Sequence, residues 1–264
     1  MFFYIAGMFG RDKVEPVKLE FGDGFLLVTI QRPEVRNAIS YEVMDGLLRA
    51  IKMVDQDPKY KVLAITGAGE QAFCSGGDLK EFHSLTNKEG AYKMLSKMGN
   101  VLWKLTTLSK PVFAFLNGTA VGGGMELATA CDFRFSKEAV KLGFIQGRQG
   151  ITTGWGGGTL LLEKINEQTA LDWLMSARFI PVKEAVQVGY INGIMENMNH
   201  EAIVKVLQPF LDKEEGVLKA YKEILNQKRR SAHVRERMEK EIENCSILWE
   251  SPVHMEIVNN FLGK

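Results

Sequence analysis

The sequence predicts an α/β fold in which parallel strands are covered by helices, followed by a helical C-terminal region. Short apolar runs alternate with stretches of helical periodicity up to about residue 196, and no strand pattern follows residue 199. Two glycine-rich loops, the first at 72–79 and the second at 117–126, each end an apolar run and open a helical one. Binding loops of parallel sheets lie at the carboxyl ends of strands, so we expect function at these two loops.

The chain begins with a predicted β-hairpin, because β-branched and aromatic runs at 17–21 and 25–30 flank Gly22-Asp23-Gly24. Ser40 is the expected N-cap of a helix that extends to about residue 55 with apolar residues at helical spacing. The same patterns predict strands at 62–66, 112–116 and 131–136, and helices at 88–108 and 165–177.

The last part of the chain is expected to be helical throughout. Helical periodicity predicts helices at 201–211, 217–226, 234–248 and 252–262. We therefore expect an α/β core over residues 1–198 and a helical C-terminal subdomain over residues 199–264. Such a subdomain commonly buries its apolar stripe against the core or a second subunit.

Composition limits the classes of partner. The 264 residues, 45% of them hydrophobic, are enough to bury a sizeable core. The 33 basic and 32 acidic residues leave a net charge of +1, which gives no broad attraction to nucleic acid or an anionic membrane surface. We expect neither as a partner, and any anionic ligand must be held locally.

The cysteines and histidines show no metal or disulfide pattern. Cys74, Cys131 and Cys245 have no C-x-x-C spacing and cannot all pair, which favours a reducing compartment and predicts a cytoplasmic protein. The four histidines lack metal-binding spacing, so no metal site is expected. Apolar residues 1–9 are too short for a membrane span and lack the basic start of a signal peptide, so we expect a soluble chain. Either Met1 or Met8 fits as the start.

The glycine loops match no nucleotide-binding motif. There is no GxxxxGK[ST] run, and neither 122–124 nor 154–158 gives GxGxxG after a strand with an acidic residue about 20 positions on. Tight packing of strand against helix explains either loop alone. Two such loops in matching contexts favour another interpretation: backbone N–H groups from both converge on one oxygen and stabilise developing negative charge, as an oxyanion hole does.

Several further segments accompany the two loops. Ile30-Gln31-Arg32-Pro33 precedes Asn37-Ala38-Ile39, Ala130-Cys131-Asp132 follows the second loop, and the stretches 154–158 and 185–191 come later. With these segments the chain resembles the crotonase (enoyl-CoA hydratase/isomerase) superfamily over nearly its whole length. The resemblance implies a ClpP/crotonase-like spiral of ββα units with a helical C-terminal subdomain, assembled as a homotrimer or a homohexamer.

The resemblance also assigns catalytic roles to particular residues. It places the oxyanion-hole amides on Gly77 and Gly123 and matches Glu126 to the first of two hydratase glutamates. Gln146 stands where the second glutamate is expected, and an amide cannot accept a proton from water. An exposed Glu in the first turn of a helix is the plain alternative for Glu126.

The expected ligand is an acyl-CoA thioester, with coenzyme A as part of the substrate and no other cofactor. The family's CoA site corresponds here to Arg36, Ala38, Ser75, Asp78, Leu79 and Lys80. A helix N-cap is the better explanation of Asp78, whereas solvated surface charge explains Arg36 and Lys80 as well as a phosphate contact does. His83 and Trp155 are further candidates for the acyl pocket, although packing explains each of them as well.

Three functions stay open at this level. The first is an enoyl-CoA hydratase/isomerase-type reaction, with Glu126 moving the proton. The second is decarboxylation of a branched malonyl-CoA, because the stretches 75–78, 154–157 and 248–252 resemble the ethylmalonyl-CoA decarboxylase branch. The third is a catalytically weak subunit that binds acyl-CoA.

Overall fold

The computed structural model describes residues 15–263, so the apolar stretch 1–9 and the choice between Met1 and Met8 lie outside the described residues. The main sheet has the strand order β1-β2-β3-β5-β7-β9. Only the β1–β2 pair is antiparallel, as the predicted hairpin requires, and the other neighbours are parallel. These strands are β1 (Val17–Phe21), β2 (Phe25–Ile30), β3 (Val62–Gly67), β5 (Val112–Leu116), β7 (Phe133–Ser136) and β9 (Gly193–Ile194).

A second, smaller sheet has the order β4-β6-β8 and was not predicted from the sequence. Its strands are parallel and only two or three residues long, too short to show a periodic pattern. Two of them are the starts of the glycine loops, which therefore begin side by side. The strands are β4 (Ala72–Cys74), β6 (Thr119–Val121) and β8 (Leu142–Gly143).

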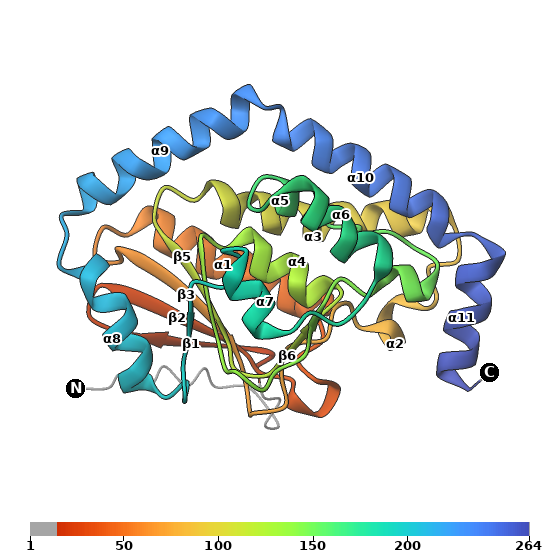
Figure 1. Cartoon of the computed structure of the whole chain (residues 1–264), viewed down its shortest axis with the longest axis horizontal. Coiled ribbons are helices and arrows are strands. Elements are labelled where there is room, and N and C mark those ends of the chain that lie inside the picture. Colours follow the sequence, from red (N-terminus) through yellow and green to blue (C-terminus); the bar gives the residue numbers. More distant parts are fainter. Residues whose placement is uncertain (1–14, 264) are drawn as a thin grey trace, which may run out of the picture.

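Helices cover the main sheet on both faces (Figure 1). α1 begins after Ser40, whose Oγ accepts a hydrogen bond from Val43 N, so the predicted N-cap is confirmed. The helices of the α/β part are α1 (Tyr41–Gln56), α2 (Leu79–Phe82), α3 (Lys88–Thr107), α4 (Gly123–Ala130), α5 (Gly157–Leu162), α6 (Glu167–Ser176) and α7 (Val182–Gln187), with short 3-10 turns η1 (Pro33–Val35) and η2 (Gln146–Gln149).

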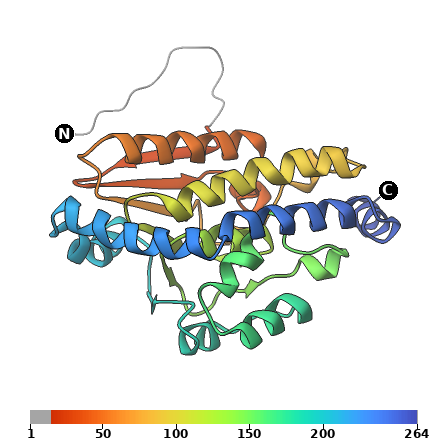
Figure 2. The same ribbon diagram turned by 90° about the horizontal axis from the view of Figure 1, so that it is seen from above.

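The C-terminal helices lie against this core. They are α8 (His200–Leu211), α9 (Glu215–Ser231), α10 (Val234–Trp249) and α11 (Pro252–Leu262). α8 buries Ile203 and Leu207 against Phe113 and Phe115 on one face of the main sheet. On the other face, α10 packs along α3 and buries Met238 and Ile242 in the larger core. α9 and α10 arch over the molecule and form a nearly continuous line when seen from above (Figures 1 and 2).

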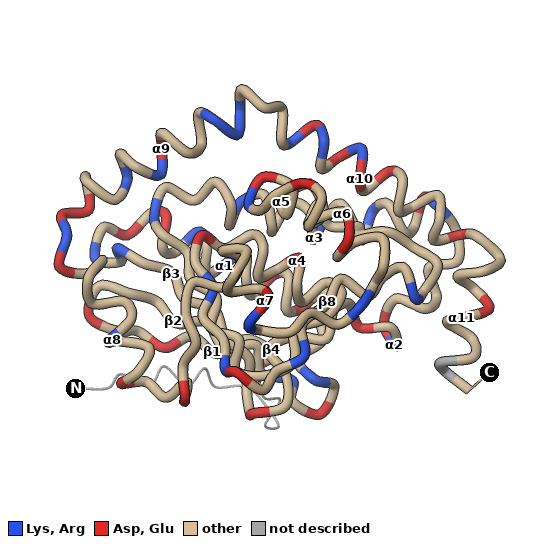
Figure 3. Tube along the Cα trace, viewed as in Figure 1, with Lys and Arg blue, Asp and Glu red and all other residues tan. Residues whose placement is uncertain are grey.

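Basic and acidic residues are interspersed along α9 and α10, and the last turn of α9 holds three consecutive basic residues (Figure 3). The prediction that a helical subdomain begins at residue 199 matches the position of α8 in the chain. The division of the chain into two domains at that point stays a prediction.

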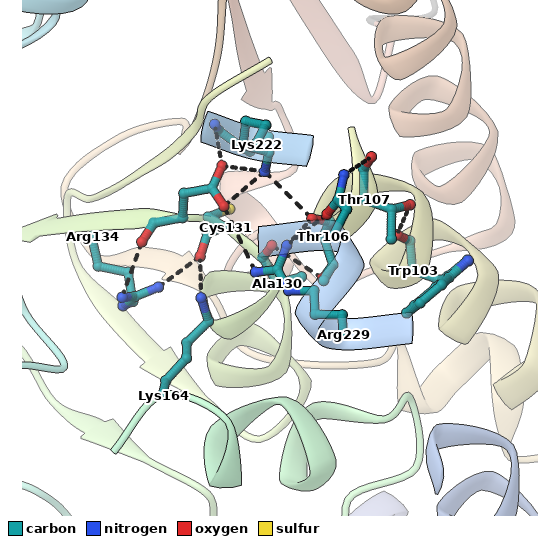
Figure 4. A network of polar contacts seen from close by, with 12 residues as sticks. Trp103, Thr106, Thr107, Ala130, Cys131, Arg134, Lys164, Lys222 and Arg229 are labelled. Carbon is teal, nitrogen blue, oxygen red and sulfur yellow. Dashed lines mark hydrogen bonds and ion pairs between the residues drawn. The ribbon is translucent and has the colours of Figure 1, made fainter. Parts of the chain in front are cut away.

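A buried polar network ties α9 to the C-terminal end of α4 (Figure 4). Lys222 Nζ donates to both carboxylate oxygens of Asp132, at 2.8 and 2.6 Å, and Arg229 donates to the Thr106 carbonyl. The carbonyls that end α4 are also satisfied by cations, because Arg134 and Lys164 both donate to Cys131 O. Positive side chains at a helix C-terminus complement the exposed carbonyls and the helix dipole. The network thus fixes the far end of the helix that begins at Gly123.

Removal of the Lys222 ammonium is expected to destabilise the protein strongly. Both partners are buried, with side-chain exposures of 7% and 8%. Arg229 lies farther from the Asp132 carboxylate, at 3.8 Å, so the loss of Lys222 leaves that negative charge only partly compensated. Lys222→Met is therefore expected to lower the free energy of unfolding by about 3 kcal/mol, at the low end of the cost of breaking a buried pair. Lys219→Met removes a more exposed pair with Glu215 on the same helix, and its effect should stay below about 1 kcal/mol. Urea unfolding of both variants measures the difference, and equal effects would contradict the assignment.

Candidate active site

The two glycine loops meet because their first residues pair in the small sheet. Ala72 pairs with Thr119 and Cys74 with Ala120, in parallel register. A Cβ built on Gly76 would lie 3.2 Å from the Gly123 nitrogen, so the loops are in direct contact. Gly77 and Gly123 both line one cavity of about 90 Å³. The structure therefore brings together the two glycines that the sequence singled out.

Within residues 15–263, the N–H groups of both glycines have no protein acceptor. Gly123 is the first residue of α4, where backbone N–H groups have no acceptor within the helix. Among hydrogen bonds between the described residues, neither the Gly77 nor the Gly123 N–H donates to another protein group. Two free donors that line one small cavity form a suitable site for an electronegative ligand atom.

The indole of Trp155 lies directly on the second glycine loop. A Cβ on Gly123 would be 2.1 Å from Trp155 Cζ3, and one on Gly77 would be 3.6 Å from Trp155 Cζ2. Glycine is therefore needed at position 123 for the ring to pack there. The other apolar lining residues come from α2, α3, α10 and the positions that flank η2: Leu79, Phe82, Met94, Leu95, Ile145, Ile151, Cys245 and Trp249.

Glu126 is buried, with 2% of its surface exposed, and its carboxylate has four hydrogen-bond donors. The N–H of Trp155 donates to Oε2 at 2.8 Å and that of Gly157 donates at 2.9 Å. The N–H of Gly154 donates to Oε1 at 3.3 Å, and Gln146 Nε2 donates to the same oxygen at 2.9 Å. The interpretation of Glu126 as an exposed first-turn residue is therefore wrong, because the residues that follow η2 close over it.

Burial raises the pKa of Glu126 to about 7, since desolvation penalises the ionised form and the negative charge of Glu241 adds to this effect. The three backbone N–H bonds act in the opposite direction and stabilise the carboxylate. The pKa of an acid or base that works near neutral pH falls in this range.

Gln146 faces Glu126 instead of solvent. Its side chain lines the cavity and is 9% exposed. Its Oε1 is buried and accepts no hydrogen bond from the described residues. The amide therefore holds one oxygen of Glu126 and supplies no group that could exchange a proton near neutral pH.

The predicted CoA segment lies against the first glycine loop. Ser75 N donates to Arg36 O at 3.1 Å, Ile39 N donates to Gly76 O at 2.8 Å, and Asp78 N donates to Ile39 O at 2.9 Å. Segments that are far apart in the sequence thus form one continuous edge beside the cavity. A role of this edge in binding CoA stays a prediction.

The residues predicted to bind CoA at that edge differ in exposure and in their hydrogen bonds. Arg36 and Lys80 are exposed, Ser75 and Leu79 line the cavity, and Ala38 is buried with its carbonyl bonded to Arg32. The Asp78 carboxylate caps α2 by accepting from Lys80 N and also pairs with Arg32 at 2.7 Å. The N-cap interpretation of Asp78 is therefore confirmed.

His83 lies outside the cavity lining. Its Nδ1 is 2.6 Å from Lys80 O at the end of α2, so the ring packs on its own turn. The expectation that His83 reaches the acyl pocket is not supported by this position, whereas Trp155 does line the cavity.

Sequence reasoning missed the contribution of α10. Cys245 and Trp249 line the cavity, and the Trp249 indole N–H donates to Leu85 O at 2.8 Å. Glu241, one helical turn before Cys245, accepts from Gly158 N and Thr159 N. The spacing 238, 242, 245 and 249 marks a buried face of this helix, but no local pattern shows which part of the core it covers.

The part of the chain that the structure describes offers neither a metal site nor a membrane-spanning helix. Within residues 15–263, no cluster of three or more His, Cys, Asp or Glu side chains is arranged to hold a metal ion. None of the helices described combines the length and the apolar character that a bilayer crossing requires.

Comparisons with solved structures agree with this architecture. An enoyl-CoA hydratase/isomerase from Mycobacterium paratuberculosis superposes with a TM-score of 0.86 at 23% identity, over 95% of this chain and 100% of that one. At this identity the likeness concerns the fold alone.

Comparisons at the sequence level are more informative. The short-chain-enoyl-CoA hydratase of Clostridium acetobutylicum is 33% identical over 171 residues, which span 64% of this chain and 65% of that enzyme. The ethylmalonyl-CoA decarboxylase of Mus musculus is 29% identical over 258 residues, or 96% of this chain and 79% of that enzyme. The family model described as enoyl-CoA hydratase/isomerase matches residues 20–256. With its two glycine loops joined at one cavity, this chain belongs to the enoyl-CoA hydratase/isomerase family.

Proposed function

We propose that this protein acts on an acyl-CoA thioester whose carbonyl oxygen accepts hydrogen bonds from the N–H groups of Gly77 and Gly123. The observation that carries the proposal is the pair of free backbone donors at one small cavity. As the thioester becomes an enolate, negative charge develops on this oxygen, and donors already in place stabilise it without reorganisation.

The reaction that best fits the site is decarboxylation of a malonyl-type acyl-CoA. Hydration needs proton transfer both from water and to the α carbon, and Gln146 cannot exchange protons. In decarboxylation the bond between the α carbon and the carboxylate breaks and CO2 leaves. The electron pair enters the thioester carbonyl, and the resulting enolate needs one proton at the α carbon. Protonated Glu126 supplies that proton and regains it from solvent.

Hydratase/isomerase-type chemistry is the second candidate. It is favoured by the relatives named as hydratases and by a pKa of Glu126 near neutrality, which allows one carboxylate to accept and return a proton. In double-bond migration the ionised form of Glu126 would act first, as a base.

Arg36 and Lys80 are proposed contacts for CoA phosphates because both are exposed at the edge formed by the first glycine loop and its partner segment.

A homotrimer or homohexamer is the proposed assembly. Apolar side chains exposed on the C-terminal helices support it: Val217, Tyr221, Ile224, Ile247 and Val253. Light scattering of the purified protein tests the mass.

The reaction type can be decided in one incubation. The protein is mixed with crotonyl-CoA, a 3-enoyl-CoA and ethylmalonyl-CoA in ¹⁸O-labelled water, and products are followed by chromatography and mass spectrometry. We expect loss of CO2 from ethylmalonyl-CoA and no ¹⁸O in a 3-hydroxyacyl-CoA. Label incorporation would support hydration, and migration of the double bond would support isomerisation. Stoichiometric CoA binding without turnover would favour the binding-subunit alternative.

The pH dependence of turnover separates the two roles of Glu126. If the protonated form donates to the enolate, the rate falls as pH rises through about 7, because the carboxyl group loses its proton there. If the ionised form acts as a base, the rate falls instead as pH drops through the same value. We expect the first profile, and Glu126→Gln should abolish this limb.

Gly123→Ala is expected to remove activity by displacing the Trp155 ring. The added Cβ would lie 2.1 Å from the indole, so the ring and the first turn of α4 must separate. We expect turnover to fall by roughly 10²–10³-fold, as when one oxyanion donor is lost, and stability to fall by about 1–3 kcal/mol through overpacking. Gly216→Ala on α9 is the control, since nothing lies within 4 Å of its added Cβ. Unchanged kcat in Gly123→Ala would contradict the assignment.

A further inference from the structure

A second carboxylate accepts hydrogen bonds from the same turn as Glu126. We call residues 154–159 the glycine turn. Glu241 on α10 accepts from Gly158 N at 3.1 Å and from Thr159 N at 2.7 Å. Glu126 on α4 accepts from the N–H groups of Gly154, Trp155 and Gly157. One short segment thus donates five backbone hydrogen bonds to two carboxylates that come from different helices.

The two carboxylates approach the glycine turn closely. A Cβ on Gly157 would lie 2.3 Å from Glu126 Cγ, and one on Gly158 would lie 3.4 Å from each Glu241 oxygen. Adjacent glycines therefore separate the two acids. A side chain at position 157 would clash with Glu126, and one at position 158 would clash with Thr153 Oγ1 at 2.7 Å. Within residues 15–263, neither acid forms an ion pair with Lys, Arg or His.

Few titratable groups face this pair. Cys245 on α10 donates its thiol to Thr152 O, and burial with the nearby acids raises its pKa, so the thiol stays neutral. α3 presents Leu95 and Gly99 to the glycine turn, and η2 presents the Gln146 amide. Arg237, one turn before Glu241, pairs with Glu163 at the end of α5. Thus no cation contacts either acid, and Glu241 is the acidic group that acts on Glu126.

We propose that Glu241 is a positioning residue for Glu126: it holds the glycine turn from α10 and, as a second carboxyl group at that turn, makes the pair retain one proton that Glu126 can donate during turnover. The inference rests on the proposed role of Glu126 as proton donor. Glu126 is buried and Glu241 is partly buried, and both accept hydrogen bonds from one short turn. Two acids placed in this way repel each other when both are ionised, so the pair retains a proton to higher pH than either acid alone. Desolvation also raises the pKa of Glu241, although its hydrogen bonds with Thr153 and Thr159 oppose this.

Glu241→Gln tests the proposal, because the amide keeps an acceptor for Thr159 N and removes the charge. Without that charge, Glu126 should lose its proton at lower pH, by about one pH unit. Turnover at pH 7.5 should fall, and it should be rescued when the pH is lowered. Glu239→Gln is the matched control, since Glu239 is exposed on the same helix and pairs with Arg235. It should leave the pH profile unchanged.

Infrared titration supplies a readout that does not depend on activity. The C=O band of the protonated Glu126 carboxyl is identified by its absence in Glu126→Gln and followed with pH in the full-length protein. Its midpoint should move to lower pH in Glu241→Gln. If Glu241→Gln does not fold, Glu241→Asp replaces it. This variant keeps the negative charge but moves it away from the glycine turn by one methylene group, so the midpoint should shift in the same direction by a smaller amount.

The possible results are distinct. An unchanged midpoint in the folded variants, even with lower turnover, would overturn the proposal and leave Glu241 a structural role. A shifted midpoint supports the proposal. If the protein turns over no acyl-CoA, the proposed function fails, yet the infrared shift still reports whether Glu241 holds the proton on Glu126.

Discussion

The candidate site depends on three hydrogen bonds, which backbone N–H groups of the glycine turn donate to the Glu126 carboxylate. These groups are buried, and a buried donor without an acceptor costs about 1–3 kcal/mol. The same bonds hold the backbone of Trp155, whose ring covers Gly123. One side chain near the start of α4 thus connects the second glycine loop to the turn that closes the cavity over it.

Two requirements of the site oppose each other. A buried acid is costly as an anion, yet the backbone N–H groups of the glycine turn require an acceptor. Two acids, one from the core and one from α10, meet this requirement, and no cation among the described residues neutralises either of them. Positive charge is concentrated at the other end of α4, where Lys222 and Arg229 surround Asp132 (Figure 4). The C-terminal helices therefore contribute to both ends of the helix that begins at Gly123.

Much of the main sheet could be predicted because most of its strands are four to six residues long and rich in apolar and β-branched residues. The hairpin at 17–30, the Ser40 cap and the buried runs at 62–67 and 112–116 have local causes: turn residues, a capping hydroxyl and apolar composition. The small sheet has no such signal, since strands of two or three residues form only where β4, β6 and β8 are brought side by side.

The sequence by itself determined which residues the site contains at its centre: the two glycine loops, Glu126, and an amide at Gln146 in place of a second acid. The two loops follow from local composition, and the resemblance to the crotonase superfamily assigns Glu126 and Gln146; neither inference depends on how the chain packs. Only the tertiary structure decided what surrounds Glu126. Its burial, its four donors and the nearness of Glu241 arise from contacts between residues separated by 20 to 83 positions in the chain. A one-dimensional pattern does not specify such contacts, because they depend on the packing of α10 over the core.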